Sequence, residues 1–312
     1  MTSHSITTAL ILAAGQGSRF GTLGKVMPKA LAPVLNQPLL VRQIKLLASG
    51  GVKDVHIVIG HLGHLIKAAI EANPIPDVSI HFHEQKERLG LAHAVAQAET
   101  ALGENPFVLI LADIAYEAKA ISDLLTLPND VDAVVAVKDE PDIDAIRRNF
   151  SVELNKDGLV RRLIEKPVDP PNSMKGTGQY VFSPAIFEAI RNTPRSELRN
   201  EYELTDAIQT LVDMGKHVAV SDTITWDLNL TFPADLLACN LYMLAQDGVD
   251  HVSVSDVPDG SVVRYSVLGS DVRFDGPVSL NRCVVLDGAV LPSGAQLEGA
   301  VIAANGQWTE DT

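Results

Sequence analysis

An apolar run that stops at a glycine-rich turn is the feature that most constrains how this chain folds. Residues 9–14 are all apolar and are followed by Gly15-Gln16-Gly17-Ser18-Arg19. A short apolar run bounded by a turn is typical of a strand buried on both faces of a parallel sheet. Glycines let the backbone approach a ligand closely, and successive N–H groups can then point at one anion. The pattern predicts a buried strand that ends in an anion-binding turn.

Two cations accompany this turn. Arg19 offers a planar guanidinium suited to phosphate oxygens, and Lys29 follows Pro28 ten residues further on. The turn is not the P-loop pattern, and Arg19 and Phe20 stand where the dinucleotide fingerprint would need a third glycine. A tight loop without any ligand is the alternative that the glycines alone leave open. The strand, the turn and the cations together favour a polyphosphate site.

The following segments alternate between strand-like and helix-like patterns. Strands are predicted at residues 54–59, 78–82, 106–113 and 131–137, and helices at residues 37–49 and 63–73. Such alternation with short connections is typical of a parallel α/β sheet, whose ligands bind at the carboxyl ends of the strands. The glycine turn and Asp113 both fall at such an end.

After residue 137 the pattern of alternating strands and helices becomes less regular. Residues 138–148 are interpreted as a charged surface loop, and residues 150–154 and 159–165 as a hairpin-like pair. A helix is predicted to begin near residue 201, with Thr205 or Asp206 as its cap.

Composition limits the classes of function. The 312 residues suffice for one large domain and a small one. The chain has no apolar run of about 18 residues and no signal-peptide pattern, and its only cysteines, Cys239 and Cys283, give no disulfide framework or zinc site. The net charge of −14 argues against nucleic acid and anionic membranes as partners. We therefore expect a cytoplasmic protein without a membrane or nucleic-acid partner, and no metal site at its scattered histidines.

From Val252 onward the apolar pattern has a period of six residues. Two sets of apolar residues repeat with this same period, and turn-forming residues follow each member of the second set. The series are Val272, Val278, Val284 and Val290, and Leu268, Phe274, Leu280 and Leu286. Two apolar registers in step predict a β-helix of about two or three coils.

Several strings in this chain resemble one known family. L-A-A-G-Q-G-S-R at residues 12–19 and P-K-A-L-A-P-V at residues 28–34 resemble the signature of sugar-1-phosphate nucleotidyltransferases, or nucleotide-sugar pyrophosphorylases. The resemblance continues at residues 85–95, 165–167, 176–182, 201–209 and 225–237. It implies a Rossmann-like α/β domain with a mixed, mainly parallel sheet over residues 1–245, and a short left-handed β-helix over residues 250–306.

The same resemblance implies a reaction and a set of site residues. The reaction is transfer of a nucleotidyl group from a nucleoside triphosphate to a sugar 1-phosphate, with release of pyrophosphate. The implied catalytic residues are Arg19, Lys29 and Lys166. The implied nucleotide-binding residues are Leu12, Ala13, Ala14, Gly15, Gly17, Ser18, Lys25, Gln85 and Gly90. The implied sugar-phosphate-binding residues are Glu165, Gly178, Glu201 and Glu203.

Mg²⁺ is the implied cofactor, with Asp113 as one ligand. Two alignments of the segment that begins at Trp226 place the second ligand differently. Counting from the tryptophan places it near Asp227, and counting back from Pro233 places it at Asn229. Positions two apart on a strand face the same side, so both remain candidates. We expect Asp227, because a carboxylate binds a hard dication better than an amide does.

The string R-F-G-T-L-G-K-V-M-P-K resembles the uridylyl- and thymidylyltransferase branches, which favours UTP or dTTP and glucose 1-phosphate. Mannose-1-phosphate guanylyl transfer and an inert regulatory or binding subunit of the same fold are the alternatives. Acyl transfer by the coil is disfavoured, because the coil is short and His251 is the only histidine nearby. We expect a homo-oligomer, a dimer or tetramer, with the coil serving assembly or stability.

Overall fold

The computed structural model describes residues 3–197, 199–304 and 306–309. The chain divides into two compact units by its internal contacts. The first unit comprises Met1–Gly15, Gln43–Gly63 and Pro74–Asp227, and the second Gln16–Arg42, His64–Asn73 and Leu228–Thr312. The segment that carries Arg19 and Lys29 therefore belongs to the same unit as the C-terminal repeat.

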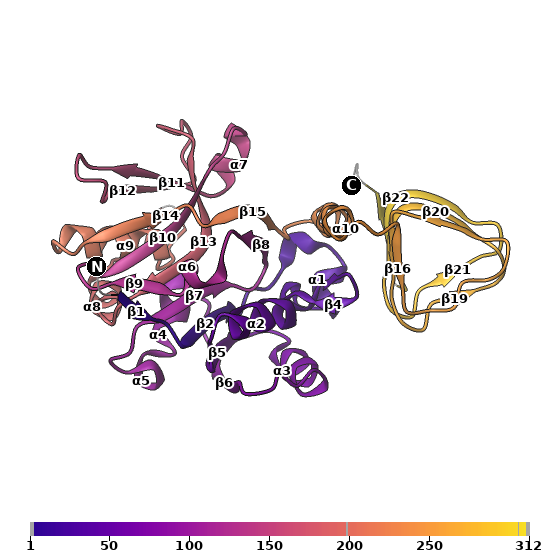
Figure 1. Cartoon of the computed structure of the whole chain (residues 1–312), viewed down its shortest axis with the longest axis horizontal. Coiled ribbons are helices and arrows are strands. Elements are labelled where there is room, and N and C mark those ends of the chain that lie inside the picture. Colours follow the sequence, from indigo (N-terminus) through magenta and orange to yellow (C-terminus); the bar gives the residue numbers. More distant parts are fainter. Residues whose placement is uncertain (1–2, 198, 305, 310–312) are drawn as a thin grey trace. The chain divides into compact units, whose positions relative to one another are not determined.

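A mixed sheet, nine-stranded over the described residues, forms the centre of the first unit (Figure 1). Its main path runs β12-β11-β13-β7-β2-β5-β6, and β10 joins β13 and β14. The neighbours β7, β2, β5 and β6 are parallel, whereas β13 runs antiparallel to β7. The strands are β2 (Thr8–Ala13), β5 (Asp54–Ile59), β6 (Ser79–Glu84), β7 (Phe107–Leu111), β10 (Ala133–Asp139), β11 (Phe150–Leu154), β12 (Val160–Glu165), β13 (Met174–Phe182) and β14 (Val218–Ser221). The predicted α/β fold with a mixed sheet is confirmed.

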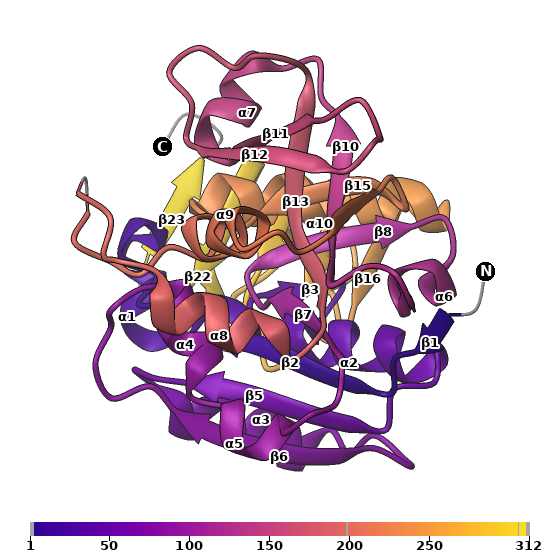
Figure 2. The same ribbon diagram turned by 90° about the vertical axis from the view of Figure 1, so that its left-hand side faces the viewer.

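Helices pack on this sheet through apolar faces. One buried core joins Leu10 and Leu109 of the sheet to Ile186 of α8 and Leu211 of α9, and Figure 2 shows α8 and α9 lying over the sheet. Across both units, the helices of the described residues are α1 (Leu23–Val26), α2 (Leu39–Ser49), α3 (Gly63–Ala72), α4 (Leu91–Ala96), α5 (Glu99–Leu102), α6 (Ile121–Leu124), α7 (Ile143–Arg148), α8 (Ala185–Asn192), α9 (Leu204–Asp213) and α10 (Pro233–Asp247). Of the helices in the described part of the chain, none is long and apolar enough to cross a membrane.

Two local predictions are wrong. Residues 138–148 are not one surface loop, because β10 extends to Asp139 and α7 begins at Ile143. The carboxylate of Asp142 accepts a hydrogen bond from the Asp144 N–H at 2.9 Å and so caps α7. The helix α9 is preceded by Glu203 at its N-cap, which makes no side-chain capping bond, so neither Thr205 nor Asp206 is the cap.

Parallel strands stacked at a spacing of 17 residues form the C-terminal part of the second unit. The Val278 N–H donates to Ser261 Oγ and the Cys283 N–H to Ser266 Oγ, each pair 17 residues apart. Figure 1 shows the three-sided course of these coils in orange and yellow. Their strands are β16 (His251–Ser253), β17 (Val262–Arg264), β18 (Ser266–Leu268), β19 (Arg273–Phe274), β20 (Ser279–Val285), β21 (Val290–Leu291) and β22 (Gln296–Ala303), followed by the antiparallel β23 (Gly306–Thr309).

The coil is one residue shorter than three six-residue units, so the predicted period slips. Val272, Val278 and Val284 are buried, as a six-residue period requires. The valine series would continue at Val290, but Val290 is 53% exposed, and the buried residue at this point of the coil is Ala289, 17 residues after Val272. One side of each coil spans five residues instead of six, which moves the apolar register by one position per coil.

Candidate functional site

The glycine turn continues, in the second unit, into the helical turns η1 (Ser18–Phe20), α1 and η2 (Lys29–Leu31). Gly17 has a φ of 64°, and a Cβ placed there would lie 3.2 Å from Cγ of Lys29. A Cβ on Gly24 would lie 2.4 Å from the carbonyl oxygen of Gly17. Glycine is therefore required in this turn by its backbone and its packing. The stem of Lys29 packs directly on the turn.

The predicted cations of this turn differ in exposure. Arg19 and Lys25 are exposed, and Lys29 is half-buried with its Nζ 6.0 Å from the centroid of the Phe20 ring. Phe20 is fully buried and directly follows Arg19, so the two cations Arg19 and Lys29 are both next to this buried residue, one in sequence and one in space. Exposed cations beside a glycine turn are suited to an anion with several oxygens.

The loop that carries the predicted nucleotide-binding residues Gln85 and Gly90 is folded on itself in the first unit. Gln85 is buried, and its Nε2 donates to the Gly90 carbonyl at 3.1 Å and lies 3.0 Å from Nδ1 of His93. Gly90 has a φ of 109°, and a Cβ there would lie 2.4 Å from the Tyr202 carbonyl oxygen. That carbonyl also accepts a hydrogen bond from the Ala92 N–H at 3.0 Å. The loop is therefore joined to the segment around Tyr202.

Arg199 gathers the acids that were predicted to bind the sugar, also in the first unit. Its guanidinium lies 3.3 Å from Glu165, 3.8 Å from Glu201 and 3.2 Å from Glu203. Nζ of Lys166 lies 3.7 Å from the Glu165 carboxylate. The structure thus brings four predicted residues into one cluster around an arginine that the sequence analysis missed.

The carboxyl of Glu203 has a pKa that is shifted by its surroundings in this cluster. Burial raises its pKa above the ordinary value, and the neighbouring Arg199 opposes that rise. A buried carboxylate is costly unless hydrogen-bond donors face it. A ligand that brings hydroxyl groups would supply such donors.

Gly178, on β13, is required by packing inside the first unit. Its φ is 85°, and a Cβ there would lie 2.4 Å from Cδ1 of Ile114. In the structure, the group that lies close to Gly178 is therefore the Ile114 side chain of β8 (Ile114–Ala118). Asp113 directly precedes this strand and lies half-buried at the carboxyl end of β7, where an α/β sheet places ligand-binding residues.

Asp227 lies in a buried cluster of ion pairs. Its carboxylate accepts hydrogen bonds from Lys175 Nζ at 2.9 and 2.8 Å, and Lys138 Nζ lies 3.1 Å away. Glu140 completes the cluster, 3.0 Å from Lys138 and 3.4 Å from Lys175. Only 1% of the Asp227 side chain is exposed. Two ammonium groups and two carboxylates leave the cluster neutral.

These ion pairs do not suit Asp227 as a magnesium ligand, and the choice between Asp227 and Asn229 stays a prediction. A ligand must direct lone pairs at the cation, but both oxygens of Asp227 face ammonium groups. Asn229, the other candidate, ends β15 (Ile224–Asn229), which pairs with β8. Within the described residues, no three or more histidine, cysteine, aspartate or glutamate side chains are grouped to hold a metal ion.

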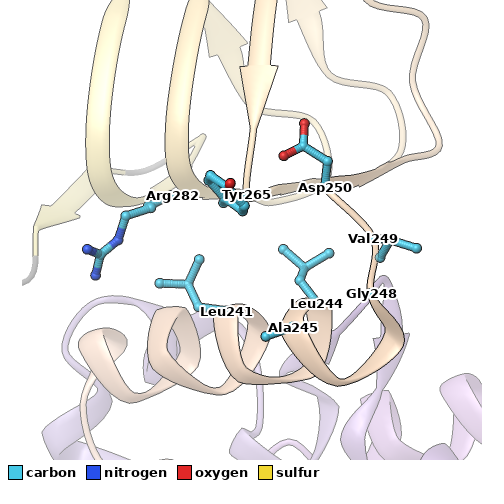
Figure 3. Close-up of a pocket in the computed structure, with 8 residues that line it drawn as sticks. All are labelled: Leu241, Leu244, Ala245, Gly248, Val249, Asp250, Tyr265 and Arg282. Carbon is cyan, nitrogen blue, oxygen red and sulfur yellow. The ribbon is translucent and has the colours of Figure 1, made fainter.

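A separate pocket of about 560 Å³ lies within the second unit, between α10 and the coil (Figure 3). Leu241, Leu244 and Val249 form its apolar side, and Tyr265 and Arg282 project from the coil. Of the predicted site residues, all of which the structure describes, none lines this pocket.

The family model described as nucleotidyl transferase matches residues 8–227. The chain is 34% identical to a glucose-1-phosphate thymidylyltransferase of Streptomyces griseus, over 93% of this chain and 88% of that one. It is 31% identical to the UTP–glucose-1-phosphate uridylyltransferase AglF of Haloferax volcanii, over 73% of this chain and 92% of that one. A solved UDP-glucose pyrophosphorylase complexed with UDP-glucose shares its fold with a TM-score of 0.67 at 22% identity, covering 77% of this chain and 99% of that one.

Proposed function

The chain belongs to the nucleotidyl transferase family, and we propose that it transfers a nucleotidyl group from a nucleoside triphosphate to a sugar 1-phosphate, releasing pyrophosphate. The observation that carries this proposal is the cluster of Glu165, Lys166, Glu201 and Glu203 around Arg199. Carboxylates for hydroxyl groups, combined with cations for a phosphate, match the two halves of a sugar 1-phosphate.

The reaction requires positioning and charge neutralisation, without a covalent intermediate on the protein. An oxygen of the acceptor phosphate attacks the α-phosphorus as the bond to pyrophosphate breaks. We assign Arg19, Lys25 and Lys29 to the triphosphate and Lys166 to the acceptor phosphate. The backbone of the glycine turn supplies further N–H donors to the triphosphate.

The remaining assignments concern the base and the sugar. We assign Gln85 and the Gly90 backbone to the base, and Glu165, Glu201 and Glu203 to sugar hydroxyls. Arg199 orders these carboxylates, because its planar fork reaches all three. The apolar residues 12–14 and Ser18 complete the nucleotide-binding turn.

We assign magnesium to Asp113 and Asn229 and not to Asp227, because lysine ammonium groups pair with the Asp227 carboxylate. Mg²⁺ is commonly held by one or two protein oxygens together with substrate phosphates. When bound, it would neutralise charge on the reacting phosphates.

UTP or dTTP with glucose 1-phosphate is the substrate pair that we propose, and the named activities of the relatives support it. The test is a pyrophosphate-release screen of UTP, dTTP, GTP and ATP against glucose 1-phosphate and mannose 1-phosphate. Release with UTP or dTTP and glucose 1-phosphate is expected. Release only with GTP and mannose 1-phosphate would identify the guanylyl alternative. Triphosphate binding without release from any pair would favour an inert binding subunit.

We further propose that the stacked coils form a left-handed β-helix, and that the chain acts in the cytoplasm as a dimer or tetramer. The parallel stacking at 17-residue intervals supports the β-helix. Light scattering coupled to size-exclusion chromatography will give the mass, and a monomer at micromolar concentration would refute the oligomer.

A further inference from the structure

A two-residue turn in the left-handed region follows the segment that carries Lys29. The short strands β3 (Pro33–Val34) and β4 (Gln37–Pro38) pair as a hairpin, and Leu35 and Asn36 between them have φ values of 49° and 63°. Hairpin turns of this kind favour asparagine and glycine, whereas a leucine in this conformation is strained. Strained backbone persists only where its surroundings hold it in place.

Asn240 of α10 holds one side of this hairpin. It is fully buried, and its Oδ1 accepts a hydrogen bond from the Leu35 N–H at 2.8 Å. Its Nδ2 donates to the Pro33 carbonyl at 3.0 Å and to the Leu236 carbonyl at 2.9 Å. A buried amide that uses both its donors and its acceptor fixes the backbone groups it contacts, since removing it would leave them unpaired.

Asn36 connects the same turn to the coil. Its Nδ2 donates a hydrogen bond of 2.7 Å to the carbonyl of Leu268, which is 232 residues away in sequence. Leu268 ends β18 and is fully buried in the apolar interior of the coil. The hairpin is therefore fastened both to α10 and to the stacked strands, all within the second unit.

Backbone contacts continue from the hairpin to the glycine turn. The Leu39 N–H donates to the Ala32 carbonyl at 3.0 Å, and the Ala32 N–H donates to the Lys29 carbonyl at 2.9 Å. The stem of Lys29 packs on Gly17. An unbroken series of contacts thus runs from Leu268 in the coil to the turn that carries Arg19.

We infer that Asn36 and Asn240 are positioning residues through which the C-terminal coil sets the geometry of the triphosphate-binding segment. The inference rests on the proposed function for its link to nucleotide affinity. The inference gives the coil a role beyond assembly and stability. Loosening the contact between the coil and the hairpin weakens binding of the triphosphate more than binding of the sugar 1-phosphate.

The test uses the full chain with two variants and a matched control. Asn36→Gly keeps the left-handed turn and removes only the hydrogen bond to Leu268. Asn240→Asp keeps the acceptor for the Leu35 N–H and loses the donors to Pro33 and Leu236. Ser266→Ala is the control, because it removes the 3.0 Å bond to the Cys283 N–H inside the coil without touching the hairpin.

Both asparagine variants should raise KM for the triphosphate roughly 5- to 20-fold, a common size for coupling between sites. KM for the sugar 1-phosphate and kcat should stay within about twofold of the wild type, which is less than a typical coupling between sites. Ser266→Ala should lower the melting temperature and leave all three kinetic constants unchanged. Equal changes for both substrates, or the same changes in Ser266→Ala, would overturn the inference.

Hydrogen–deuterium exchange gives a readout that needs no turnover. Amides of residues 16–34 should exchange faster in Asn36→Gly than in the wild type, and at the wild-type rate in Ser266→Ala. If no substrate pair reacts, the proposed function fails while this measurement still tests the link between coil and segment. Unchanged exchange in Asn36→Gly would refute the link even if Asn240→Asp does not fold.

Discussion

The ammonium of Lys175 donates hydrogen bonds to both carboxylate oxygens of Asp227, at 2.9 and 2.8 Å. The two side chains are 4% and 1% exposed, so the pair lies in the interior of the first unit. Removing one partner of such a pair leaves an uncompensated buried charge, which costs more than the intact pair contributes. This relationship separates the roles of Asp227 and Asn229.

Asp227→Ala should destabilise the protein by roughly 3–5 kcal/mol, the usual cost of breaking a buried ion pair. The Mg²⁺ concentration for half-maximal turnover should remain that of the wild type. Asn229→Ala should raise this concentration strongly with little change in melting temperature. Thermal unfolding and a magnesium titration separate the two effects, and Lys175→Met combined with Asp227→Leu should recover much of the stability. A higher magnesium requirement in Asp227→Ala than in Asn229→Ala would return the metal site to Asp227.

Asp113→Asn should reduce turnover roughly a hundredfold or more while the protein still folds, because a charged clamp on the reacting phosphates is lost. Steady-state kinetics at saturating Mg²⁺ and circular dichroism measure the two properties. Asp157→Asn, in the exposed turn between β11 and β12, is the control and should behave like the wild type. Near-normal turnover of Asp113→Asn would remove Asp113 from the site.

Arg199→Ala should raise KM for the sugar 1-phosphate about tenfold or more, since losing one charged hydrogen-bonding partner costs about 1.5–3 kcal/mol. KM for the triphosphate should stay unchanged. Arg199→Lys should recover only part of the loss, because lysine lacks the fork that reaches three carboxylates. Arg161→Ala, which breaks an exposed pair with Glu153, is the matched control. A uniform loss for both substrates would contradict a role of Arg199 in ordering the sugar site.

The pH dependence of stability should carry a contribution from Glu203. Burial raises the pKa of its carboxyl in the folded state above the ordinary 4.5. Between the pKa of this carboxyl in the unfolded chain and its raised pKa in the folded protein, the folded protein binds more protons than the unfolded chain. The contribution of Glu203 to stability therefore falls as pH rises through this window. Glu203→Gln should therefore melt higher than the wild type above the window, and the difference should shrink as pH falls below it. A difference in melting temperature that is independent of pH would show that ionisation of Glu203 is not its cause.

Three histidines on β5 and β6 should make stability depend on pH in the opposite direction. Burial, with His81 and His83 beside it, lowers the pKa of His56 from 6.5 to about 4, although Asp54 opposes the shift. Nδ1 of His56 lies 2.9 Å from Nε2 of His83. The unfolded chain binds more protons between these values, so stability should fall as pH drops from 6.5 to 4. His56→Gln should flatten this slope in a pH series of melting temperatures, and an unchanged slope would show that His56 is not its cause.

Local signals in the sequence predicted the sheet and the glycine turn, because an apolar run followed by glycine depends on neighbouring residues only. The helix α7 escaped prediction, since Ile146 is its only buried residue and a short polar segment shows no period. Arg199 and Lys175 were missed for another reason. Lys175 pairs with Asp227, 52 residues away, and Arg199 joins the nearby Glu201 and Glu203 to Glu165, 34 residues away. No local pattern encodes either of these clusters. The shortened side of each coil was likewise invisible until strand pairing fixed which residues stack.

The 17-residue spacing of the coils has a consequence for how the gene for this protein can change. Duplication or loss of 17 codons after Leu268 adds or removes one whole coil, about 4.8 Å of length, and keeps every inward-facing position in phase. An insertion within a strand that is not a multiple of 17 residues shifts the following inward-facing positions out of phase. The hydrogen bond from Asn36 reaches Leu268, ahead of all such changes. The far end of the coil is thus open to variation in length while its contact with the glycine-turn segment is inherited unaltered.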